Sequence, residues 1–525
     1  MDVLPASITS YLVLGHNHFS GQLEDFKCNS LRWIDLRNNQ LQGPLPNSIQ
    51  NLVNLTKLDL SFNNFSGHVD VSLFSDLKQL RVLDLSYNRI ALTNENKVNF
   101  TWLESHDMLL LAACVVKELE FLRSAKQLGE LDLSNNKLQG RILDWAWSNW
   151  MFSLPGLNLS HNMLTSVDSI PLQYVDTIDL RSNLLQGSLP IPPNSTRYFF
   201  ILENNLSEEI PSSICNLTSL EMLDLGRNNL HGEIPRCLVN ITALGVLDIR
   251  HNNLSGNLPR AFSNGYSLTS FNLHDNKLEG KVPRSLANCK ELQVLDLGDN
   301  HLIGTFPMWL GTLPKLRFNE LHGSIRSPTI ENIFPNLRLL DLSSNAFTEN
   351  LPTSLFQHLK ALRTIDPSKK EPSYGYYQDT VAAVTKGLEL EVVRILSLYT
   401  TVDLSNNKFE GHIPSFMGDL VVLPMLNLSH NGLEGQIPPS LGNLSGVESL
   451  DLSDNHLVGE IPVQFSSLTS LEVLNLSHNH LEGCIPQGPQ FATFEKNSYE
   501  GNDGLHGIPV SKGYGNDHVS DTYLD

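Results

Sequence analysis

Four basic side chains recur where the sequence repeats with a period of 24 residues. Arg250 and His274 stand two residues before equivalent asparagines. Arg227 and His251 stand one residue before such asparagines. If consecutive repeats form adjacent strands, about 4.8 Å apart, these side chains make a compact cationic patch. Such a patch could dock a ligand that carries a carboxylate.

The same repeats also supply acidic neighbours for these cations. The candidate partners are Asp224, Asp248, Asp275 and Asp296. Ion pairs within and between the repeats would then neutralise the patch, and the basic side chains would have a structural role. Both interpretations stay open at the level of the sequence.

Three tyrosines crowd into a stretch where the repeat is interrupted. Residues 369–381 read KKEPSYGYYQDTV, with Tyr374, Tyr376 and Tyr377 close together. Tyrosine provides a large contact area at a small cost in conformational entropy. The three rings are therefore expected either to bind a partner or to cover the small core of their own segment.

Two cysteines lie at similar places in consecutive repeats. Cys215 and Cys237 could form a disulfide between neighbouring coils in an oxidising compartment, or could remain free thiols. The chain has six cysteines in 525 residues, and no pair has the CxxC spacing of a zinc site or a redox motif. No metal site is therefore expected, and the core must be hydrophobic.

Charge and residue distribution argue against two broad function classes. The chain has 36 Lys and Arg against 56 Asp and Glu, a net charge of -20, so no surface for nucleic-acid phosphates is expected. The histidines and aspartates recur with the repeat and do not form a converging set of nucleophile, base and metal ligands. We therefore predict no catalytic residues, no cofactor and no enzymatic activity.

The elements that must position these residues follow one pattern, LxxLxLxxNxLxGxIP. Between Asn204 and Asn300 its asparagine recurs every 24 residues, four times in succession. Across the chain the pattern predicts 19 units. Their asparagine slot is occupied by residues 17, 39, 63, 88, 114, 136, 162, 183, 204, 228, 252, 276, 300, 319, 345, 407, 431, 455 and 479.

Each unit is expected to open with a short strand whose leucines, such as Leu223 and Leu225, point inward. The asparagine turns the chain, and its buried amide can bond the backbone of neighbouring coils. Cys114, a small buried side chain with a weak donor, can fill that slot once. The glycine of the pattern suits a positive φ, and Ile-Pro starts an extended outer segment.

Stacking explains how such units become stable. No single unit can bury its own leucines, so stability comes from interfaces between neighbours and is roughly additive. The outer side takes more room than the strand side, so the stack is expected to curve and to present a long concave face. That face is the first place to look for binding.

The pattern fails in two places. From Asn345 to Asn407 is 62 residues, which leaves an insertion of about 38. Within it, TVAAV and LELEVVRIL read as two strands around a TKG turn, which predicts a β-hairpin against the solenoid. Between Asn300 and Asn319 the spacing is only 19, so that coil is either pinched or carries a deletion.

The LxGxIP form of the repeat resembles the plant extracellular leucine-rich repeat. The whole chain, from about residue 11 to 515, resembles the ectodomain of plant receptor-like proteins that sense microbial elicitors. The segment LNLSHNHLEGCIPQGPQFATFEKNSYEGNDGLHGIPVSKG, from Leu474, is especially similar to the closing part of that family. The resemblance implies an α/β solenoid: a curved right-handed superhelix of about 19 plant-type units with a parallel sheet on the concave face.

The family resemblance also implies a division of the chain. Residues 1–366 and 398–486 would be repeats, 367–397 a non-repeat island, and 487–525 a cap-like and juxtamembrane-like tail. In the family such an island grips a ligand or a co-receptor kinase. Lys370 and Tyr376 resemble a Lys and Tyr pair of that island, so both are expected to contact ligand or co-receptor.

The implied function is recognition at the outer side of the plasma membrane. The expected partners are a microbial or endogenous protein or peptide ligand and co-receptor and adaptor kinases, because the chain has no kinase domain of its own. Three alternatives stay open: a soluble apoplastic inhibitor of a microbial cell-wall-degrading enzyme, a receptor for an endogenous developmental peptide, and a non-functional truncated copy. We see no signal peptide, cysteine-bearing N-terminal cap or membrane helix, and His506 and Tyr514 stand where the family often has cap cysteines. We therefore expect a truncated ectodomain.

Asn-x-Ser/Thr sequons are numerous in the chain. Several are by-products of the LNLS and NNLS stretches of the repeat, and those on the outer side are better candidates for glycans in a secreted protein. The predicted glycosylation sites are Asn54, Asn99, Asn194, Asn216, Asn240 and Asn443.

Overall fold

The fold is seen in a computed structural model. It describes residues 10–27, 29–94, 107–260, 262, 267–303, 308–314, 316, 318–320, 337, 339–341, 343, 350–351, 356–357, 359–363, 380–385, 388–393 and 400–510. The chain forms two compact units, Met1–Pro259 and Arg260–Asp525, and each is described by itself.

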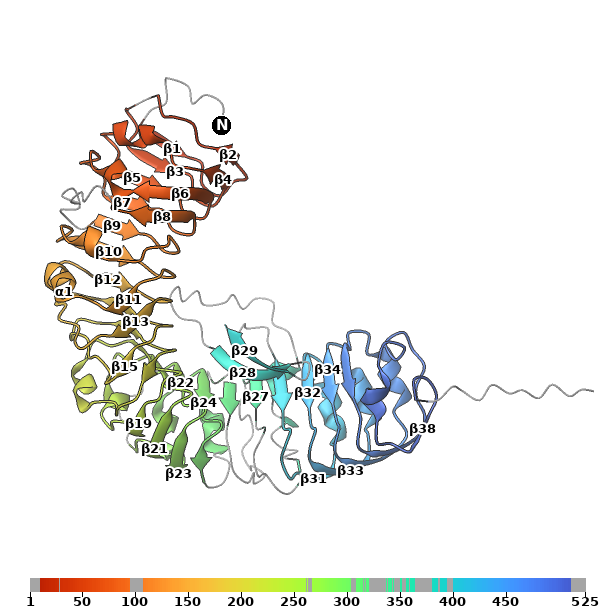
Figure 1. The fold of residues 1–525 in the computed structure, drawn as a ribbon. Coiled ribbons are helices and arrows are strands. Elements are labelled where there is room, and N and C mark those ends of the chain that lie inside the picture. The colour runs from red at the N-terminus through yellow and green to blue at the C-terminus, as the bar shows by residue number, and fades with distance from the viewer. Residues whose placement is uncertain are drawn as a thin grey trace, which may run out of the picture. The chain divides into compact units, whose positions relative to one another are not determined.

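The first unit is a stack of coils that each contribute one short strand to a parallel sheet (Figure 1). The strands pair in chain order, so each coil lies beside the next one in the sequence. They are β1 (Tyr11–Val13), β3 (Trp33–Asp35), β5 (Lys57–Asp59), β7 (Val82–Asp84), β9 (Asp107–Leu110), β10 (Leu128–Asp132), β12 (Gly156–Asn158), β14 (Thr177–Asp179), β16 (Tyr198–Phe200), β18 (Met222–Asp224) and β20 (Val246–Asp248).

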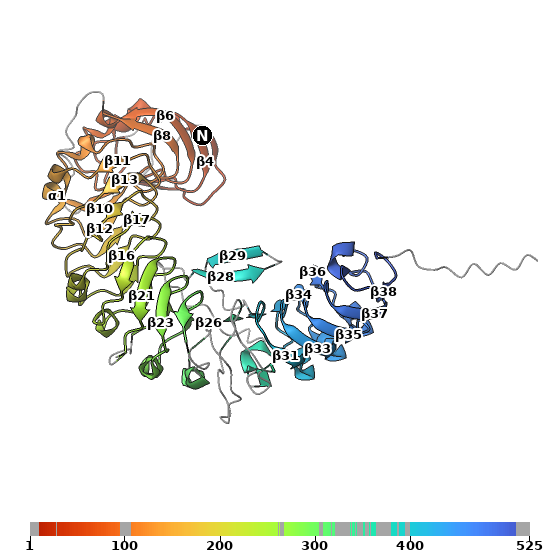
Figure 2. The same ribbon diagram turned by 60° about the horizontal axis from the view of Figure 1, so that its bottom comes forward.

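The second unit repeats this arrangement, and its strands also pair in parallel and in chain order (Figure 2). They are β22 (Ser270–Asn272), β24 (Val294–Asp296), β26 (Phe318–Glu320), β27 (Leu339–Asp341), β30 (Thr401–Asp403), β32 (Met425–Asn427), β34 (Ser449–Asp451) and β36 (Val473–Asn475). In each unit we call the solvent side of this sheet the strand face. It is made by the residues before, between and after the inward leucines.

A second set of short strands follows the asparagine turns. In the first unit these are β2 (Ser20–Gln22), β4 (Gln40–Gly43), β6 (Asn64–Asp70), β8 (Arg89–Thr93), β11 (Gln139–Arg141), β13 (Met163–Ser166), β15 (Gln186–Gly187), β17 (Asn205–Leu206), β19 (His231–Glu233) and β21 (Asn253–Asn257). In the second unit they are β23 (Lys277–Gly280), β25 (His301–Leu302), β31 (Glu410–His412), β33 (Gly432–Gln436), β35 (His456–Gly459), β37 (His480–Cys484) and β38 (Gly504–His506).

The outer side of the coils is mostly 3₁₀-helical. Its segments are η1 (Asn47–Asn51), η2 (Val71–Phe74), η3 (Glu120–Leu122), η4 (Ser212–Asn216) and η5 (Leu238–Asn240) in the first unit, together with the α-helix α1 (Asp144–Trp150). The second unit has η6 (Arg284–Asn288), η7 (Met308–Thr312), η8 (Lys360–Leu362), η9 (Ser415–Asp419), η10 (Pro439–Asn443), η11 (Val463–Ser467) and η12 (Lys496–Tyr499).

The repeat pattern explains both the core and the turns. Leu223 and Leu225 are fully buried, which confirms that the leucines of the strand point inward. Gly232, the glycine of the same repeat, has a φ of 82°, a conformation that costs glycine little and other residues much. On the outer side, a Cβ added to Gly418 would lie 2.0 Å from the carbonyl oxygen of Ser440, so glycine is required for η9 and η10 to stack.

One expected slot is wrong. Asn319 was expected to be a turn asparagine, but β26 pairs it with Leu295 and Leu340, so it occupies the central position of a strand. Leu295 and Asn319 are 24 residues apart, so this coil has the ordinary length, and the expected spacing of 19 came from assigning a strand residue to the turn slot. The strand itself is retained because pairing on both sides sets its register.

Inside the island, β28 (Thr380–Thr385) pairs with β29 (Leu388–Val393) in antiparallel fashion. Thr385 lies opposite Leu388, as expected for strands joined by a short turn. The predicted pairing of the two strands is thereby seen in the described residues, and Figure 1 draws them as two cyan arrows, whereas their placement against the solenoid stays a prediction.

Candidate functional site

A ladder of asparagine side chains holds the strand face in place. In the coil of β18, the amide nitrogen of Asn228 donates to the carbonyl oxygens of Ile201, Leu225 and Gly226, each at 3.1 Å. Its amide oxygen accepts from the backbone N–H of Leu206 at 3.1 Å. One buried side chain thus bonds its own turn and the preceding coil, as the sequence pattern predicts.

Cys114 fills the same slot between β9 and β10. Its thiol donates to the carbonyl oxygen of Leu85 at 3.1 Å and contacts that of Ala112 at 3.5 Å. Burial raises the pKa of this thiol to about 12, so it stays protonated and remains a donor. The expectation that cysteine can replace asparagine here is confirmed.

Charged and aromatic side chains alternate on the strand face near β14 and β16. The guanidinium of Arg181 bonds both carboxylate oxygens of Asp179, with a shortest distance of 2.6 Å. Its carbon atom Cζ also lies 5.0 Å from the ring centroid of Phe200, in the adjacent strand. The cation is therefore held in one orientation by a carboxylate and an aromatic ring.

A second network lies where β16 and β18 begin. Arg197 Nε donates to Glu221 at 2.8 Å, and the hydroxyl of Tyr198 donates to the same carboxylate at 3.0 Å. The hydrogen bond from Arg197 lowers the pKa of the Glu221 carboxyl, while burial raises the pKa of Tyr198. These partly exposed side chains place both charge signs and an aromatic ring on consecutive coils.

In the first unit, burial removes Arg250 from the exposed part of the predicted cationic patch. Arg250 is only 5% exposed, and its Nη1 lies 3.2 Å from the carboxylate of Asp248. Arg227 and His251 are partly exposed and stand next to the ladder asparagines, with φ of 51° and 50°. Arg250 therefore matches the interpretation of local pairing, and Arg227 and His251 are only partly exposed.

His274 belongs to the second unit, and it is also buried. Its Nδ1 lies 3.3 Å from Asp296 Oδ1, and its Nε2 lies 3.5 Å from Asp299 Oδ2. Only 5% of its side chain is exposed, while 54% of Asp299 is exposed. The imidazole therefore contacts acidic residues of the next coil, and local pairing describes it as well. Side chains on this face cover one another because adjacent strands are so close.

Buried carboxylates accompany these cations. Asp224 is 3% exposed, and its carboxylate accepts from the backbone N–H of Gly226 at 3.1 Å. Burial, followed by the neighbouring carboxylate of Asp248, raises the pKa of Asp224 to about 8, and the Arg250 guanidinium acts in the opposite direction. The strand face thus carries a titratable group with a pKa near neutrality.

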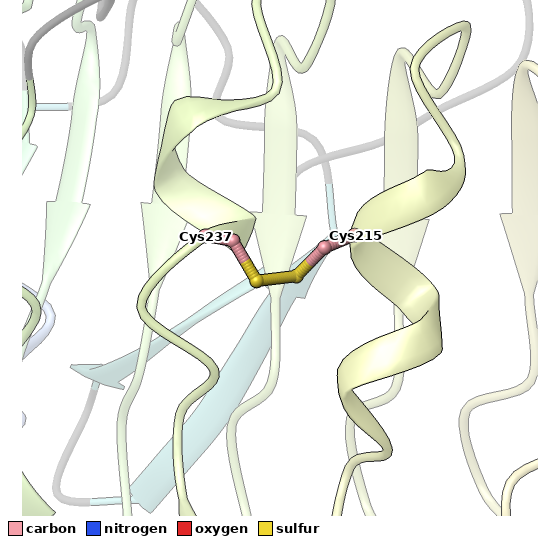
Figure 3. Close-up of a disulfide and its surroundings, with 2 residues drawn as sticks. All are labelled: Cys215 and Cys237. Carbon is pink, nitrogen blue, oxygen red and sulfur yellow. A yellow bond between two sulfur atoms is a disulfide. The ribbon is translucent and has the colours of Figure 1, made fainter.

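A disulfide joins Cys215 to Cys237 on the outer side of consecutive coils (Figure 3). Cys215 lies within η4, and Cys237 directly precedes η5. Their Cα atoms are 5.8 Å apart, a common separation for a disulfide. The bond links coils that are neighbours in the first unit, whereas Cys114 and Cys289 are buried free thiols and Cys484 is an exposed one.

The predicted sequons differ in accessibility. Asn54, Asn194, Asn216 and Asn443 are exposed, and Asn240 is partly exposed. By contrast Asn427, in one of the LNLS stretches, is 8% exposed and donates to Asp403 at 3.1 Å. A strand asparagine of this kind packs among the side chains of the strand face and is poorly placed for a glycan.

Several predicted residues lie outside the described part of the chain. They are Asn99 and the island residues Lys370, Tyr374, Tyr376 and Tyr377. The described residues contain no group of three or more His, Cys, Asp or Glu side chains that could hold a metal ion. None of the helical segments in the described ranges combines the length and apolarity that a bilayer span requires.

Sequence reasoning missed an aromatic group at the first coils. The rings of Phe62 and Tyr87 stack with centroids 4.5 Å apart and an interplanar angle of 13°. In a separate contact at the start of β5, Lys57 Nζ lies 5.1 Å from the ring centroid of Trp33 in the adjacent strand. The sequence feature that could have predicted this stack is that Phe62 and Tyr87 each stand directly before a ladder asparagine in consecutive repeats.

Two family models described as leucine-rich repeats match the chain. One matches residues 242–302 and 435–481. The other matches residues 30–52, 54–77, 127–149, 219–241, 336–358, 400–420 and 423–444. The matches recur along both units, in agreement with the solenoid.

Similar curated proteins are receptor-like proteins of Arabidopsis thaliana. Receptor like protein 22 is 41% identical over 416 residues, which cover 75% of this chain and 53% of that protein. Receptor-like protein 53 is 38% identical over 422 residues, which cover 72% of this chain and 41% of that protein. The chain thus spans about half the length of the curated relatives it matches.

Among solved structures, the fold is similar to receptor ectodomains. The Arabidopsis receptor kinase HAESA, crystallised with the peptide hormone IDA and the co-receptor SERK1, matches with a TM-score of 0.67 and 27% identity. That match covers 94% of this chain and 82% of the matched chain in that structure. PEPR1 in its complex with AtPEP1 matches with a TM-score of 0.52 and 26% identity, covering 91% of this chain and 73% of the matched chain in that structure.

The repeat models, the receptor-like relatives and the solenoid architecture agree with one another. The chain therefore belongs to the leucine-rich-repeat proteins and, within them, to the plant receptor-like proteins.

Proposed function

We propose that this chain is the ligand-recognition region of a plant receptor-like protein and that it binds a protein or peptide outside the cell. The observation that carries the proposal is the match to receptor-like proteins over about three quarters of the chain, on a solenoid like that of a peptide-bound receptor. The proposed location is the extracellular side of the plasma membrane.

The strand face supports a role in recognition. Arg197, Tyr198 and Glu221 lie on consecutive coils and present hydrogen-bonding groups of both charge signs. Arg227 and His251 add partly exposed basic groups in the following coils. Because each coil contributes a few side chains at a fixed spacing, an extended ligand could be read coil by coil.

At a finer level, the proposed ligand is a microbial elicitor, and the proposed partner in signalling is a co-receptor kinase. The structure of HAESA contains such a co-receptor, SERK1, which supports this arrangement for a solenoid of similar fold. Lys370 and the tyrosines Tyr374, Tyr376 and Tyr377 of the island are the proposed contacts. Defence signalling is the proposed outcome of binding.

A receptor for an endogenous peptide is the second candidate. It is favoured by one observation: the similar ectodomain of HAESA was crystallised with a peptide hormone. The two candidates share the binding region and differ in the source of the ligand.

The test is capture of partners by the secreted protein, with residues 367–397 intact or deleted. The ligands offered are apoplastic elicitor preparations and, separately, synthetic endogenous peptides, each with and without co-receptor ectodomains. We expect elicitor capture by the intact protein and its loss on deletion, while circular dichroism stays unchanged because the repeats flanking the island remain paired.

The outcomes separate the candidates. If the protein captures only endogenous peptides, its ligand is a hormone and not a microbial elicitor. Capture that survives the deletion would assign recognition to the strand face instead of the island. Failure of the intact, folded protein to capture any of these ligands would overturn the proposed function.

A further inference from the structure

Most sequons of the chain fall into three slots of the repeat, and the fold treats each slot differently. One slot lies within the strands of the strand face, a second lies on the outer side, and a third directly follows a ladder asparagine. The third slot holds Asn64, Asn205 and Asn253. It belongs to a surface that we call the flank, which is made by the exposed residues of the second set of short strands, such as Gln186 and His231.

In the strand slot, the fold uses both ends of the asparagine amide. Asn427 Nδ2 donates to Asp403 in the adjacent strand at 3.1 Å. Its Oδ1 accepts from the backbone N–H and the hydroxyl of Ser429, at 3.1 and 2.8 Å. Asn475 repeats the arrangement two coils further along. Because adjacent strands lie about 4.8 Å apart, a sugar on either Nδ2 would break a hydrogen bond between strands and push them apart.

Asn205, in β17, differs from the strand asparagines in each of these respects. Its side chain is exposed, and its Oδ1 accepts from Asn229 Nδ2, in the next coil, at 2.7 Å. Within the described part of the chain, no acceptor bonds Asn205 Nδ2. A glycosylated asparagine keeps its Oδ1, so the bond from Asn229 is compatible with a sugar on Asn205. Ser207, which completes the sequon, is also exposed.

Asn253, in β21, is a second exposed asparagine of the flank. It lies in register with His231 of β19. The imidazole Nδ1 of His231 bonds the carbonyl oxygen of Ser207, in the preceding coil, at 2.7 Å, so the ring is held on the side away from β21. The Asn253 side chain makes no hydrogen bond to any other described residue, and space for a sugar remains beside it. Asn64 is only partly exposed.

We propose that Asn205 and Asn253 carry N-linked oligosaccharides. In the transfer, the amide Nδ2 forms a bond to the anomeric carbon of an oligosaccharide held on a lipid diphosphate. The bond from that carbon to the diphosphate breaks, the diphosphate keeps the electron pair, and Nδ2 releases one proton. The inference rests on the proposed extracellular location, because the transfer takes place in the secretory pathway. The disulfide between Cys215 and Cys237 is of the kind that such an oxidising compartment allows.

The two modifications would shield the flank of the first unit. β17 and β21 are two coils apart, which is about 10 Å along the stack. Beside them the flank has a hollow lined by Glu208, Glu209 and His231. Oligosaccharides next to this hollow would keep proteins away from it, so a partner of this unit would approach the strand face.

The test is mass spectrometry of the whole chain after secretion from plant cells. The protein is digested, and a peptide N-glycosidase that accepts plant glycans releases them in heavy-oxygen water, which labels each asparagine that carried one. We expect label at Asn205 and Asn253, as at Asn216 on the outer side, and no label at Asn427 or Asn475. Asn205→Gln and Asn253→Gln should each remove one oligosaccharide from the mass of the intact protein.

Paired substitutions separate loss of the sequon from damage to the fold. Ser207→Ala leaves Asn205 and its bond to Asn229 in place but should abolish the modification, whereas Ser207→Thr should keep it. Both variants should show the circular dichroism of the natural chain. His231→Thr completes a sequon at Asn229, which is exposed in the same slot of the coil between, and should add an oligosaccharide there.

Three results would overturn the inference. If Asn216 is labelled while Asn205 and Asn253 are not, the assignment to the flank fails and the extracellular location stands. If Asn427 or Asn475 is labelled as fully as Asn205 in the folded protein, exposure and hydrogen bonding do not select the sites. If the folded protein is secreted without label at any sequon, the inference fails, and ligand capture by the same protein then decides separately on the proposed function.

Discussion

At the scale of single residues, buried polar groups make the folded state sensitive to pH. The carboxyl of Asp224 is surrounded by other side chains of the strand face, and its pKa rises from an ordinary value of 3.8 to about 8. In the folded chain it therefore binds a proton over a range of pH where the unfolded chain has released it.

The first prediction concerns this proton. Because the folded pKa is the higher one, the contribution of Asp224 to stability is complete below about pH 4 and is lost as the pH rises through about 8. Asp224→Asn keeps an oxygen for Gly226 N–H without the charge. We expect it to reduce the loss of unfolding free energy between pH 5 and pH 8 by about 1–3 kcal/mol. Denaturant titrations at several pH values measure this.

Comparison with Asp132 supplies the control. Burial also raises the pKa of this carboxyl, but hydrogen bonds from the backbone and hydroxyl of Ser134 act against it. Asp132→Asn should therefore flatten the pH profile less than Asp224→Asn. Equal slopes for the natural chain and Asp224→Asn would contradict the assignment.

The second prediction concerns Cys114, which holds a place that asparagine holds in most coils. Its thiol makes two contacts with carbonyl oxygens, whereas the amide of Asn136 donates three hydrogen bonds. Cys114→Asn should raise the unfolding free energy by about 0.5–1.5 kcal/mol, because an amide donates better and also offers an acceptor.

The reverse exchange provides the comparison. Asn136→Cys should lower the unfolding free energy by a similar amount, measured by the same denaturant titration. If Cys114→Asn destabilised the chain, steric fit and not hydrogen bonding would decide the occupant of this slot.

At the scale of elements, the disulfide links two coils that already stack on each other. Cys215 and Cys237 are separated by 22 residues, so the bond restricts a short loop of the unfolded chain. For a loop of this length the expected contribution to stability is about 3 kcal/mol. It reinforces the first unit, which contains both cysteines.

The third prediction follows from this link. Cys215→Ser combined with Cys237→Ser should lower the melting temperature of the first unit, and a reducing agent should lower that of the natural chain to the same value. Cys484→Ser, at an exposed free cysteine, is the matched control and should have no effect. A melting temperature insensitive to reduction would show that the disulfide adds nothing to stability.

At the scale of the whole molecule, each coil contacts mainly its neighbours in the sequence. The pairing of strands in chain order within each unit makes stability a sum over neighbouring interfaces. Damage is therefore expected to remain near its origin.

The fourth prediction tests that locality. Asn228→Ala removes an amide that joins the coil of β18 to the coil of β16. Hydrogen exchange followed by mass spectrometry should show faster exchange in coils within residues 198–257 and unchanged protection in residues 400–484. Uniform loss of protection along the chain would indicate a single cooperative unit instead.

The repeat allowed much of this architecture to be predicted from the sequence. Spatial neighbours in a solenoid are one period apart in the chain, so the inward leucines, the asparagine ladder and the proximity of Cys215 and Cys237 could be predicted from spacing alone. The hairpin of the island was also predictable, because its alternation and turn are local features.

Features that depend on packing against adjacent coils were decided by the tertiary structure. Spacing placed Arg250 and His274 on the strand face, but side chains of neighbouring strands bury them beside aspartates. Asn319 was expected in a turn but lies in a strand, where it pairs with Leu295 and Leu340. The turns of two consecutive coils bring the rings of Phe62 and Tyr87 to 4.5 Å between centroids, and both residues stay about half exposed there. Sequence period determines which residues meet, whereas their burial, ionisation and exposure depend on the volume and charge of every neighbour.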